Sequence, residues 1–504
     1  MNAFGKDHSM RRLHRQRWLL SGLLLAGLQA TACSINPVSG LPEVTLISVE
    51  QEKKIGEEEA KKVEAQMGLL KDEQFLPYLD ALGQRLAKES PRQDLTYRFH
   101  LADMAEPNAF ALPGGYVYVT RGLLALVNSE DELAGVVGHE IGHVAARHTV
   151  QKISKQGPFA VVFGIASGIT GMVSPLVGHI IGGVGDLTQG VLFSPYSRSQ
   201  ETEADRVGQD MAANAGWNPA ALSVFLNTLG REVELMSKEP RKPSFFDSHP
   251  ATPDRVTKTA AHARELTQAS QAPISATNEA FLARLDGMVY GQRAANGVFE
   301  GRTFLHPDMN FFLEFPEKWN NDNTPERIVS AAPNKDAAVV VGAVAEGSDP
   351  LEGARQLENK AKIDVVSKTE KTTINQLPAA FTQIKANGDV TLHITWIAHG
   401  GLIYQVVGMA PTRNFEALQA LFWSVAHSFR PLSASERTGV KEKRIRLVKA
   451  QAGESIEALA ARTNSAWKKE QIAVVNNLAV GDQLKEGQLV KVAIAELYEP
   501  KKSR

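Results

Sequence analysis

The sequence predicts a multidomain α+β protein. Its 504 residues exceed one ordinary core and suggest about three domains. Helical apolar spacing dominates the first half, and strand-like alternation becomes frequent after residue 294. The formal net charge of -1 gives no indication of nucleic-acid binding. We expect a mainly helical domain with a small sheet at 34–293, an α+β domain at 294–435, and a linker with a small βααβ module at 436–504.

Residues 1–33 are typical of a secretory signal peptide. Several arginines precede the apolar run 18–28, which is too short for a comfortable membrane span, and small residues follow it. Cys33, the only cysteine, ends a segment that resembles a lipobox. We expect export to the bacterial periplasm and a lipid on Cys33, and Ser34 favours the outer membrane. The alternative is cleavage near Ala32 with an unmodified thiol.

The elements of the first domain follow from its periodicity. Helices are expected in "SVEQEKKIGEEEAKKVEAQMG" and "EQFLPYLDALGQRLAKE", and strands in "YRFHLADM" and "YVYVT". A further helix is expected over 130–151 with Ser129 as its N-cap, and helices continue to about Gly291. The uncharged, glycine-rich stretch 158–185 is expected to form either a mobile hairpin or lid, or buried packing helices.

The stretch "GHEIGHVAARH", residues 138–148, carries a candidate metal site. His139 and His143 lie one helical turn apart, about 6 Å along the axis, so both imidazoles can reach one tetrahedral zinc ion. Glu140 is rotated by about 100° from His139 and can serve as general base toward water. Zinc lowers the pKa of water, and a carboxylate then takes the proton. His148 is out of step and is expected to be solvated at the helix end. A surface helix with scattered histidines is the alternative.

A later segment, "SRSQETEADRVGQDMA", offers the missing carboxylate ligand. Glu201 and Asp205 share one helix face at a spacing of four, and Glu203 points nearly opposite. Glu201 as third ligand, with Asp205 orienting a zinc-bound imidazole, is a coherent arrangement. Taken alone, the segment could equally be a solvated acidic helix start that the helix dipole favours.

Four motifs in this order, "NAFALPGGYVYVTRGLL", "GHEIGHVAARH", "ETEADRVGQDMA" and "SHPATPDRV", resemble the zinc metallopeptidases of the HtpX/BepA type, the gluzincin family that includes the CAAX prenyl protease. The resemblance covers roughly 47–266. It implies a zincin fold with one Zn²⁺ per chain bound by His139, His143 and Glu201, and Glu140 as the catalytic base. It also implies that substrate pairs with the edge strand after Asn108. The expected substrate-binding residues are Asn108, Ala109, Phe110, Gly114 and Gly115.

His249, in "DSHPATPDRV", is expected to reach the metal from a loop that a proline stiffens. Its imidazole either stabilises the oxyanion, assisted by Arg255, or occupies the open zinc position and keeps the enzyme latent. We favour the latent ligand, and a simple loop histidine is the third possibility.

The remaining regions carry no catalytic constellation. Region 294–435 reads as four strands, "MNFFLEFP", "AAVVVGAVA", "TLHITWIA" and "GLIYQVVGMA", with a helix at "NFEALQALFWSVAHSF". A polar linker is expected around "SASERTGVKEKR". The segment after it resembles a LysM module, which implies peptidoglycan as a partner.

The expected function is that of a zinc-dependent endopeptidase of the bacterial cell envelope, which cleaves unfolded or misassembled proteins with a metal-activated water. Two alternatives remain open. One is a peptidoglycan-tethered scaffold or chaperone lipoprotein with a silent protease domain, and the other is a peptidoglycan hydrolase.

Overall fold

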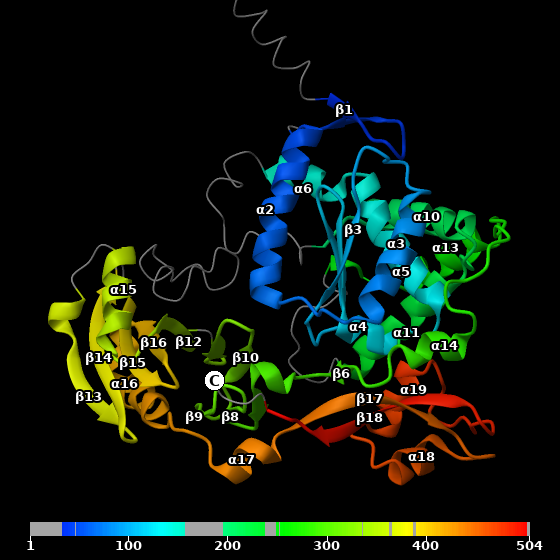
Figure 1. The fold of residues 1–504 in the computed structure, drawn as a ribbon. Helices are drawn as coiled ribbons and strands as arrows, with labels where there is room; N and C mark the ends of the chain where they lie inside the picture. Colours follow the sequence, from blue (N-terminus) through cyan, green and yellow to red (C-terminus); the bar gives the residue numbers. More distant parts are fainter. Residues whose placement is uncertain are drawn as a thin grey trace, which may run out of the picture.

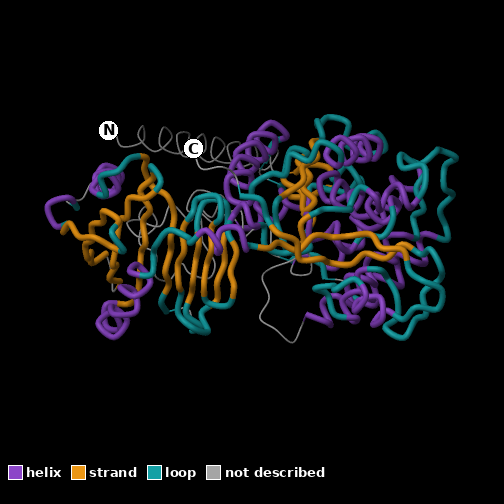
Figure 2. The backbone as a smooth tube through the Cα atoms, turned by 60° about the horizontal axis from the view of Figure 1, so that its bottom comes forward, coloured by secondary structure: helices purple, strands orange, loops and turns teal. Residues whose placement is uncertain are grey.

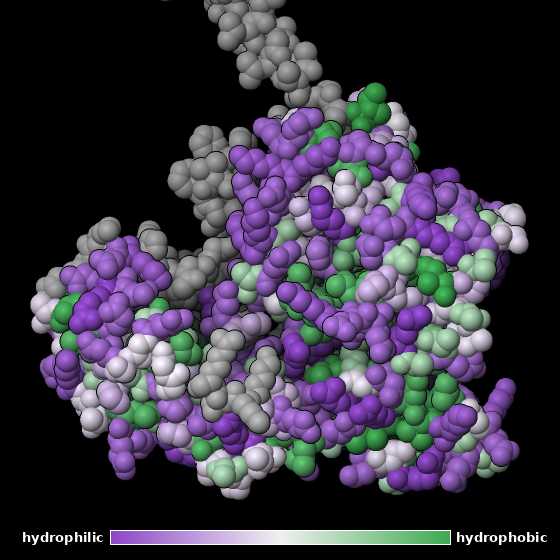
Figure 3. Space-filling model, viewed as in Figure 1, coloured by the Kyte–Doolittle hydropathy of each residue, from purple (hydrophilic) through white to green (hydrophobic). Residues whose placement is uncertain are grey.

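The structure is a computed structural model that describes residues 33–45, 47–156, 195–236, 248–250, 252–334, 336–361, 365–386 and 390–500. The predicted signal peptide up to residue 32 and the glycine-rich stretch 158–185 therefore lie outside the described residues. Within the described residues, every helix is too short or too polar to cross a membrane. The chain forms two lobes (Figure 1), and on the face drawn in Figure 3 hydrophobic side chains form small, separated areas between hydrophilic ones.

The larger lobe is mainly helical, as predicted. Serine caps start several of its helices: Ser48 and Ser197 each form a capping box, and the Ser129 side chain accepts a hydrogen bond from the Glu132 N–H. A short hairpin of β1 (Cys33–Ile35) and β2 (Pro42–Val44) precedes them. The helices are α2 (Val49–Met67), α3 (Phe75–Ala87), α4 (Arg121–Leu126), α5 (Glu130–Ala145), α6 (His148–Gln156), α10 (Arg198–Asn214), α11 (Ala221–Met236), α13 (Pro253–Ala263) and α14 (Asn278–Ala283).

A small three-stranded sheet packs against these helices, in the order β3 (Arg98–Ala102), β5 (Tyr116–Thr120), β4 (Ala109–Leu112). β3 and β5 are parallel and β4 is antiparallel to β5, so β4 is an edge strand, as predicted. Gly114 and Gly115 make the β4–β5 turn with φ of +79° and +95°, a region that favours glycine. A Cβ on Gly115 would lie 2.8 Å from the Thr96 carbonyl oxygen.

The helix predicted over 130–151 is confirmed except at residues 146 and 147, where it is interrupted. α5 ends at Ala145, Arg147 has a φ of +56°, and α6 starts at His148. The Arg147 guanidinium donates to Glu52 Oε2 at 3.1 Å and to the Ile47 carbonyl at 2.8 Å. These contacts with distant residues hold Arg147 in the left-handed conformation and redirect the chain.

The smaller lobe contains a seven-stranded antiparallel sheet in the order β10-β11-β12-β16-β15-β14-β13. Helix α15 (Leu351–Ala361) covers part of one face, and α16 (Thr412–His427) packs on the other. The predicted strands are confirmed as β9, β12, β15 and β16, and the predicted helix as α16. The strands are β10 (Asn320–Asn323), β11 (Ile328–Ala331), β12 (Ala338–Glu346), β13 (Glu370–Ile374), β14 (Leu377–Ala386), β15 (Val390–His399) and β16 (Leu402–Pro411), with β7 (Val298–Glu300), β8 (Thr303–His306) and β9 (Phe311–Glu314) in a separate sheet.

The C-terminal region returns to the larger lobe. The predicted linker is wrong, because its residues form the capped helix α17 (Ala434–Gly439) and the start of β17 (Lys441–Lys449). β17 pairs with β18 (Leu489–Leu497) and with β6 (Val289–Tyr290), and Figure 2 shows the long β17–β18 ribbon between helices. Helices α18 (Ile456–Arg462) and α19 (Lys469–Val475) complete the expected strand-helix-helix-strand order. The assignment of this module to the LysM type stays a prediction.

Candidate metal centre

Glycines allow α5 and α10 to approach each other closely. A Cβ on Gly208 of α10 would lie 2.6 Å from the backbone nitrogen of His139. A Cβ on Gly142 of α5 would lie 2.8 Å from the carbonyl oxygen of Ala204. At contacts this short, a side chain at either glycine would require the two helices to move apart. The close approach brings the two histidines of α5 opposite the carboxylates of α10.

Four donor atoms converge between these helices and the loop before α13. The Nε2 atoms of His139 and His143 lie 3.0 Å apart, and His249 Nδ1 lies 3.1 Å from His139 Nε2. Glu201 Oε1 lies 3.0 Å from His249 Nδ1 and 3.3 Å from His143 Nε2. A tetrahedral zinc site with bonds of about 2.0–2.1 Å has edges of about 3.3 Å. The spacing and the N/O donor set fit a zinc ion.

The partners of the imidazoles support the same conclusion. His139 Nδ1 lies 2.9 Å from Asp205 Oδ1, so its proton is on Nδ1 and its Nε2 keeps a lone pair. His143 Nδ1 lies 2.8 Å from His148 Nδ1, which directs the His143 Nε2 lone pair to the same point. Both imidazoles are 1% exposed, and their Nε2 atoms, 3.0 Å apart, are too close for a water molecule to lie between the two lone pairs. Two buried lone pairs that face each other repel, and a cation that both of them coordinate turns this repulsion into attraction.

Arg255 of α13 joins the two carboxylates of α10. Its Nε and Nη2 donate to Asp205 at 2.9 and 2.7 Å, and its Nη1 lies 2.6 Å from Glu201 Oε2. Burial raises the pKa of Asp205, but the hydrogen bond from His139 and the charge of Arg255 outweigh burial and lower it. The structure therefore directs the Arg255 guanidinium to these carboxylates, and its predicted role toward an oxyanion stays a prediction.

Glu140 lies beside the four donors. Its side chain is 1% exposed, and its Oε1 has no hydrogen-bond partner among the described residues. His249 Nε2 lies 3.7 Å from Oε1. Burial raises the pKa of Glu140, and the imidazoles of His249 and His139 oppose this shift. A buried carboxylate with a raised pKa and a free oxygen is suited to accept a proton.

The prediction for His148 is wrong. Its side chain is 0% exposed, because the interruption of the helix at Arg147 directs the His148 side chain toward His143. His148 Nε2 lies 3.0 Å from Glu203 Oε2, so Glu203, which was expected to point away from Glu201, supports His143 through His148. Sequence reasoning found neither this connection nor Tyr196, whose ring stacks on His143 at a centroid distance of 4.0 Å.

The predicted substrate-binding residues fall into two groups. Asn108, Ala109 and Phe110 lie at the start of the edge strand β4, and both side-chain polar atoms of Asn108 are buried without a partner among the described residues. Gly114 and Gly115 lie in the turn at the far end of β4, where a Cβ on Gly114 would lie 3.1 Å from the Lys53 Cα. The conformation and close packing of the turn are sufficient to explain why glycine occupies both positions. Contact of the five residues with substrate stays a prediction.

Comparison with known proteins agrees with this geometry. Residues 74–263, from α3 to α13, match the model of peptidase family M48. The chain is 29% identical to the beta-barrel assembly-enhancing protease of Yersinia pestis over 247 residues, which are 47% of this chain and 50% of that protein. It is 29% identical to the mitochondrial metalloendopeptidase OMA1 of Schizosaccharomyces pombe over 254 residues, 48% of this chain and 71% of that protein. The chain thus spans about half the length of the beta-barrel assembly-enhancing proteases it matches.

Proposed function

Because residues 74–263 belong to peptidase family M48, we propose that the protein is a zinc-dependent endopeptidase of the bacterial cell envelope, which cleaves unfolded or misassembled proteins. One observation carries the proposal. Donor atoms of His139, His143, Glu201 and His249, all buried, lie within 4.8 Å of one another, and the Glu140 carboxylate lies beside them.

In this proposal His139, His143 and Glu201 hold the ion. When bound there, zinc acts as a Lewis acid that acidifies water and polarises the scissile carbonyl. Asp205 fixes the His139 tautomer by accepting a hydrogen bond from its Nδ1–H. Arg255 offsets the negative charge of Glu201 and Asp205, which are otherwise costly to bury side by side.

Glu140 is the proposed proton carrier. Its carboxylate removes a proton from the attacking water and then delivers it to the leaving amide nitrogen. Burial favours this role, because a raised pKa brings the carboxyl closer to neutral pH, where it can both accept and return a proton.

His249 is the proposed resting ligand. Its Nδ1 completes the four-atom donor set, at 3.1 Å from His139 Nε2 and 3.0 Å from Glu201 Oε1. In this position its imidazole takes the place that water and substrate need, so the described conformation supports a latent state. Release of His249 would then precede cleavage.

The envelope location and the substrate class rest on the relatives and on the N-terminal sequence. A relative named beta-barrel assembly-enhancing protease supports substrates among misassembled envelope proteins. The lipid proposed on Cys33 would hold the enzyme at the outer membrane, and peptidoglycan contact through the C-terminal module would hold it near the cell wall. Both attachments are proposals from the sequence alone.

Casein and purified sacculi, each incubated with the full-length protein, separate the three functions considered. We expect cleavage of casein only, and loss of cleavage after zinc is removed by a chelator. Glu140→Gln should retain zinc and lower turnover by a factor of about 10² or more. Glu58→Gln, on the exposed face of α2, controls for the substitution itself.

Three results would contradict the proposal. Casein cleavage by Glu140→Gln at the wild-type rate would exclude Glu140 as the base. Degradation of sacculi alone would indicate a peptidoglycan hydrolase. Zinc-loaded wild-type and His249→Ala proteins that are both inactive on both substrates would indicate the scaffold or chaperone, because His249→Ala removes the proposed latency.

A further inference from the structure

The central sheet of the smaller lobe contains a strand that is only half paired. β12 pairs with β16 from Ala338 to Glu346, whereas β11 pairs only with Ala338 to Val341 on its other side. Along residues 342–346, which we call the open edge, no strand of the described residues pairs with β12 on that side. An open edge presents a row of backbone N–H and C=O groups that can pair with another chain.

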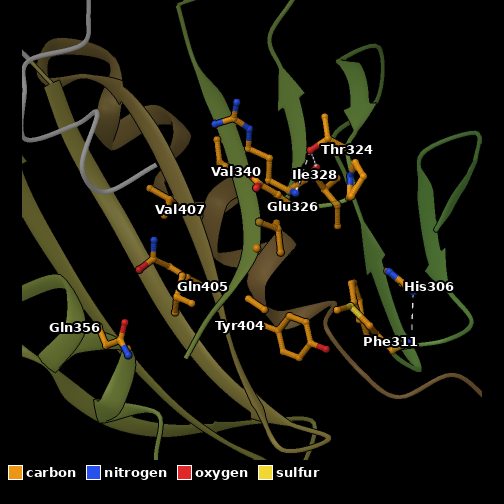
Figure 4. A pocket seen from close by; sticks show the side chains of 18 of the residues that line it. His306, Phe311, Thr324, Glu326, Ile328, Val340, Gln356, Tyr404, Gln405 and Val407 are labelled. Carbon is orange, nitrogen blue, oxygen red and sulfur yellow. Dashed lines mark hydrogen bonds between the residues drawn. The ribbon is translucent and has the colours of Figure 1, made fainter. Parts of the chain in front are cut away.

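A cavity of about 460 Å³ lies along this edge (Figure 4). The loop 324–327, which joins β10 to β11, forms part of its wall. The Thr324 N–H donates to the Arg327 carbonyl at 2.8 Å, and the Arg327 N–H donates to Thr324 Oγ1 at 3.2 Å. Because this closed loop precedes Ile328, β11 begins only at the level of Val341, and the space beside residues 342–346 has no paired strand among the described residues.

The cavity extends over both faces of the sheet. On one side of β12 it is lined by Gln405 and Val407 of β16 and by Gln356 of α15. On the other side it is lined by His306 and Phe311. Tyr404 belongs to this second face, because it neighbours Gln405 on β16 and its ring centroid lies 5.0 Å from that of Phe311.

This shape identifies the occupant. Successive side chains of a β-strand point to opposite faces, so a strand added at the open edge would place alternate side chains in the two halves of the cavity. A compact ligand would need only one half. The loop lies against Gly342, where a Cβ would lie 3.0 Å from the Glu326 carbonyl oxygen. Beyond it the edge contains the small residues Ala343 and Ala345, which leave room for an approaching backbone.

We propose that the open edge and its cavity bind an extended polypeptide segment, which joins the sheet beside β12. Phe311 and Tyr404 favour an apolar or aromatic side chain in one half. Gln356 and Gln405 accommodate a polar side chain in the other half. The site goes beyond the proposed function, because it holds a chain without cutting it, and it would give a protease for unfolded proteins a second contact with its substrate.

Site-specific crosslinking tests the location. The probe is reduced, carboxymethylated α-lactalbumin, which stays unfolded, and the full-length protein carries Glu140→Gln so that the probe is not cleaved. We expect p-benzoylphenylalanine at Glu326, an exposed residue of the loop that forms the cavity wall, to crosslink the probe. The matched control is the same group at Thr373 of β13, the opposite edge strand, which does not line the cavity. Equal crosslinking at both positions, or none at Glu326, would overturn the proposal.

Filling each half of the cavity tests the binding mode. Ala343 is the cross-strand partner of Tyr404, so Ala343→Trp fills the Phe311 half, and Gln356→Trp fills the α15 half. With fluorescent probe and anisotropy, each variant should bind about tenfold more weakly, and Thr373→Trp should bind like the parent.

Weakening by only one of the two tryptophans would indicate a compact ligand and refute strand addition, and so would unchanged binding in both. Thermal unfolding of each variant checks its fold. Should one variant unfold, the other variant and the crosslinking still decide the question. Because binding is measured without cleavage, failure here leaves the proposed peptidase activity untouched, and absence of that activity leaves this test valid.

Discussion

Replacing Gly208 by alanine should weaken zinc binding without changing a ligand. A Cβ at this position would lie 2.6 Å from the backbone nitrogen and 2.9 Å from the Cα of His139. Both are backbone atoms, so no rotamer change relieves the contact. Restoring an ordinary contact of about 3.4 Å requires α10 to move away from α5 by about 0.8 Å.

This displacement is large for a metal centre. Glu201 lies on α10 with its Oε1 3.3 Å from His143 Nε2, and zinc-ligand distances tolerate deviations of about 0.2 Å. Overpacking of this kind costs about 1–3 kcal/mol. If this cost falls on the zinc-bound geometry, the zinc Kd should rise by about 5- to 150-fold, since 1.4 kcal/mol corresponds to a factor of ten.

Gly230→Ala on α11 is the matched control, because a Cβ there meets nothing within 4 Å. It should stabilise the protein by about 0.5–1 kcal/mol through helix propensity and leave the zinc Kd unchanged. Titration of the metal-free proteins against a chromogenic zinc chelator gives both Kd values, and thermal unfolding gives the stabilities. If Gly208→Ala binds zinc as tightly as Gly230→Ala, close packing of α5 and α10 does not maintain the site and the reasoning fails.

Three further predictions follow from the site and the N-terminus. Glu201→Ala should lose bound zinc, whereas Glu203→Ala, which removes only the acceptor of His148, should retain it; equal zinc contents by atomic absorption would mean that Glu201 is not the ligand. His249→Ala should raise basal casein hydrolysis with zinc retained, and a fall of about 10² would instead favour the oxyanion role. Cys33→Ser should move the protein from membranes to the soluble periplasmic fraction with casein hydrolysis unchanged; a wild-type protein that is already soluble and carries no lipid by mass spectrometry would refute lipidation.

The sequence was sufficient to predict the positions of site residues where local periodicity determines the geometry. His139 and His143 lie on one helix, so their spacing alone places both imidazoles on one side. It was insufficient at Arg147, whose left-handed conformation depends on Glu52, 95 positions earlier. The position of His148 beside His143 is a consequence of that long-range contact, so the helical periodicity of the sequence does not predict it.

The difference between local pattern and long-range contact also explains which strands of region 294–435 were predicted. Strands with strong apolar alternation, such as β15 and β16, were predicted from their residues. The strands β10 and β13, with sequences NNDN and EKTTI, have no such pattern. They form because neighbouring strands satisfy their backbone groups, which is a tertiary effect. The open edge of β12 likewise depends on where β11 begins, opposite Val341, and the sequence of β12 alone does not indicate it.

The C-terminal module and the helix of the metal centre belong to one folding unit. Lys491 of β18 is 1% exposed, and its Nζ donates to the carbonyls of Ala125 at 2.8 Å and Val127 at 2.7 Å. These carbonyls end α4, immediately before α5. A single hydrophobic core also runs from α5 into β17 and β18. Deleting the module would therefore expose this hydrophobic core to water and remove the Lys491 donor from the two carbonyls, and both changes would destabilise α4 and α5. A truncated protein that loses activity would consequently report on the stability of α5, and glycan binding has to be tested with surface substitutions in the intact chain.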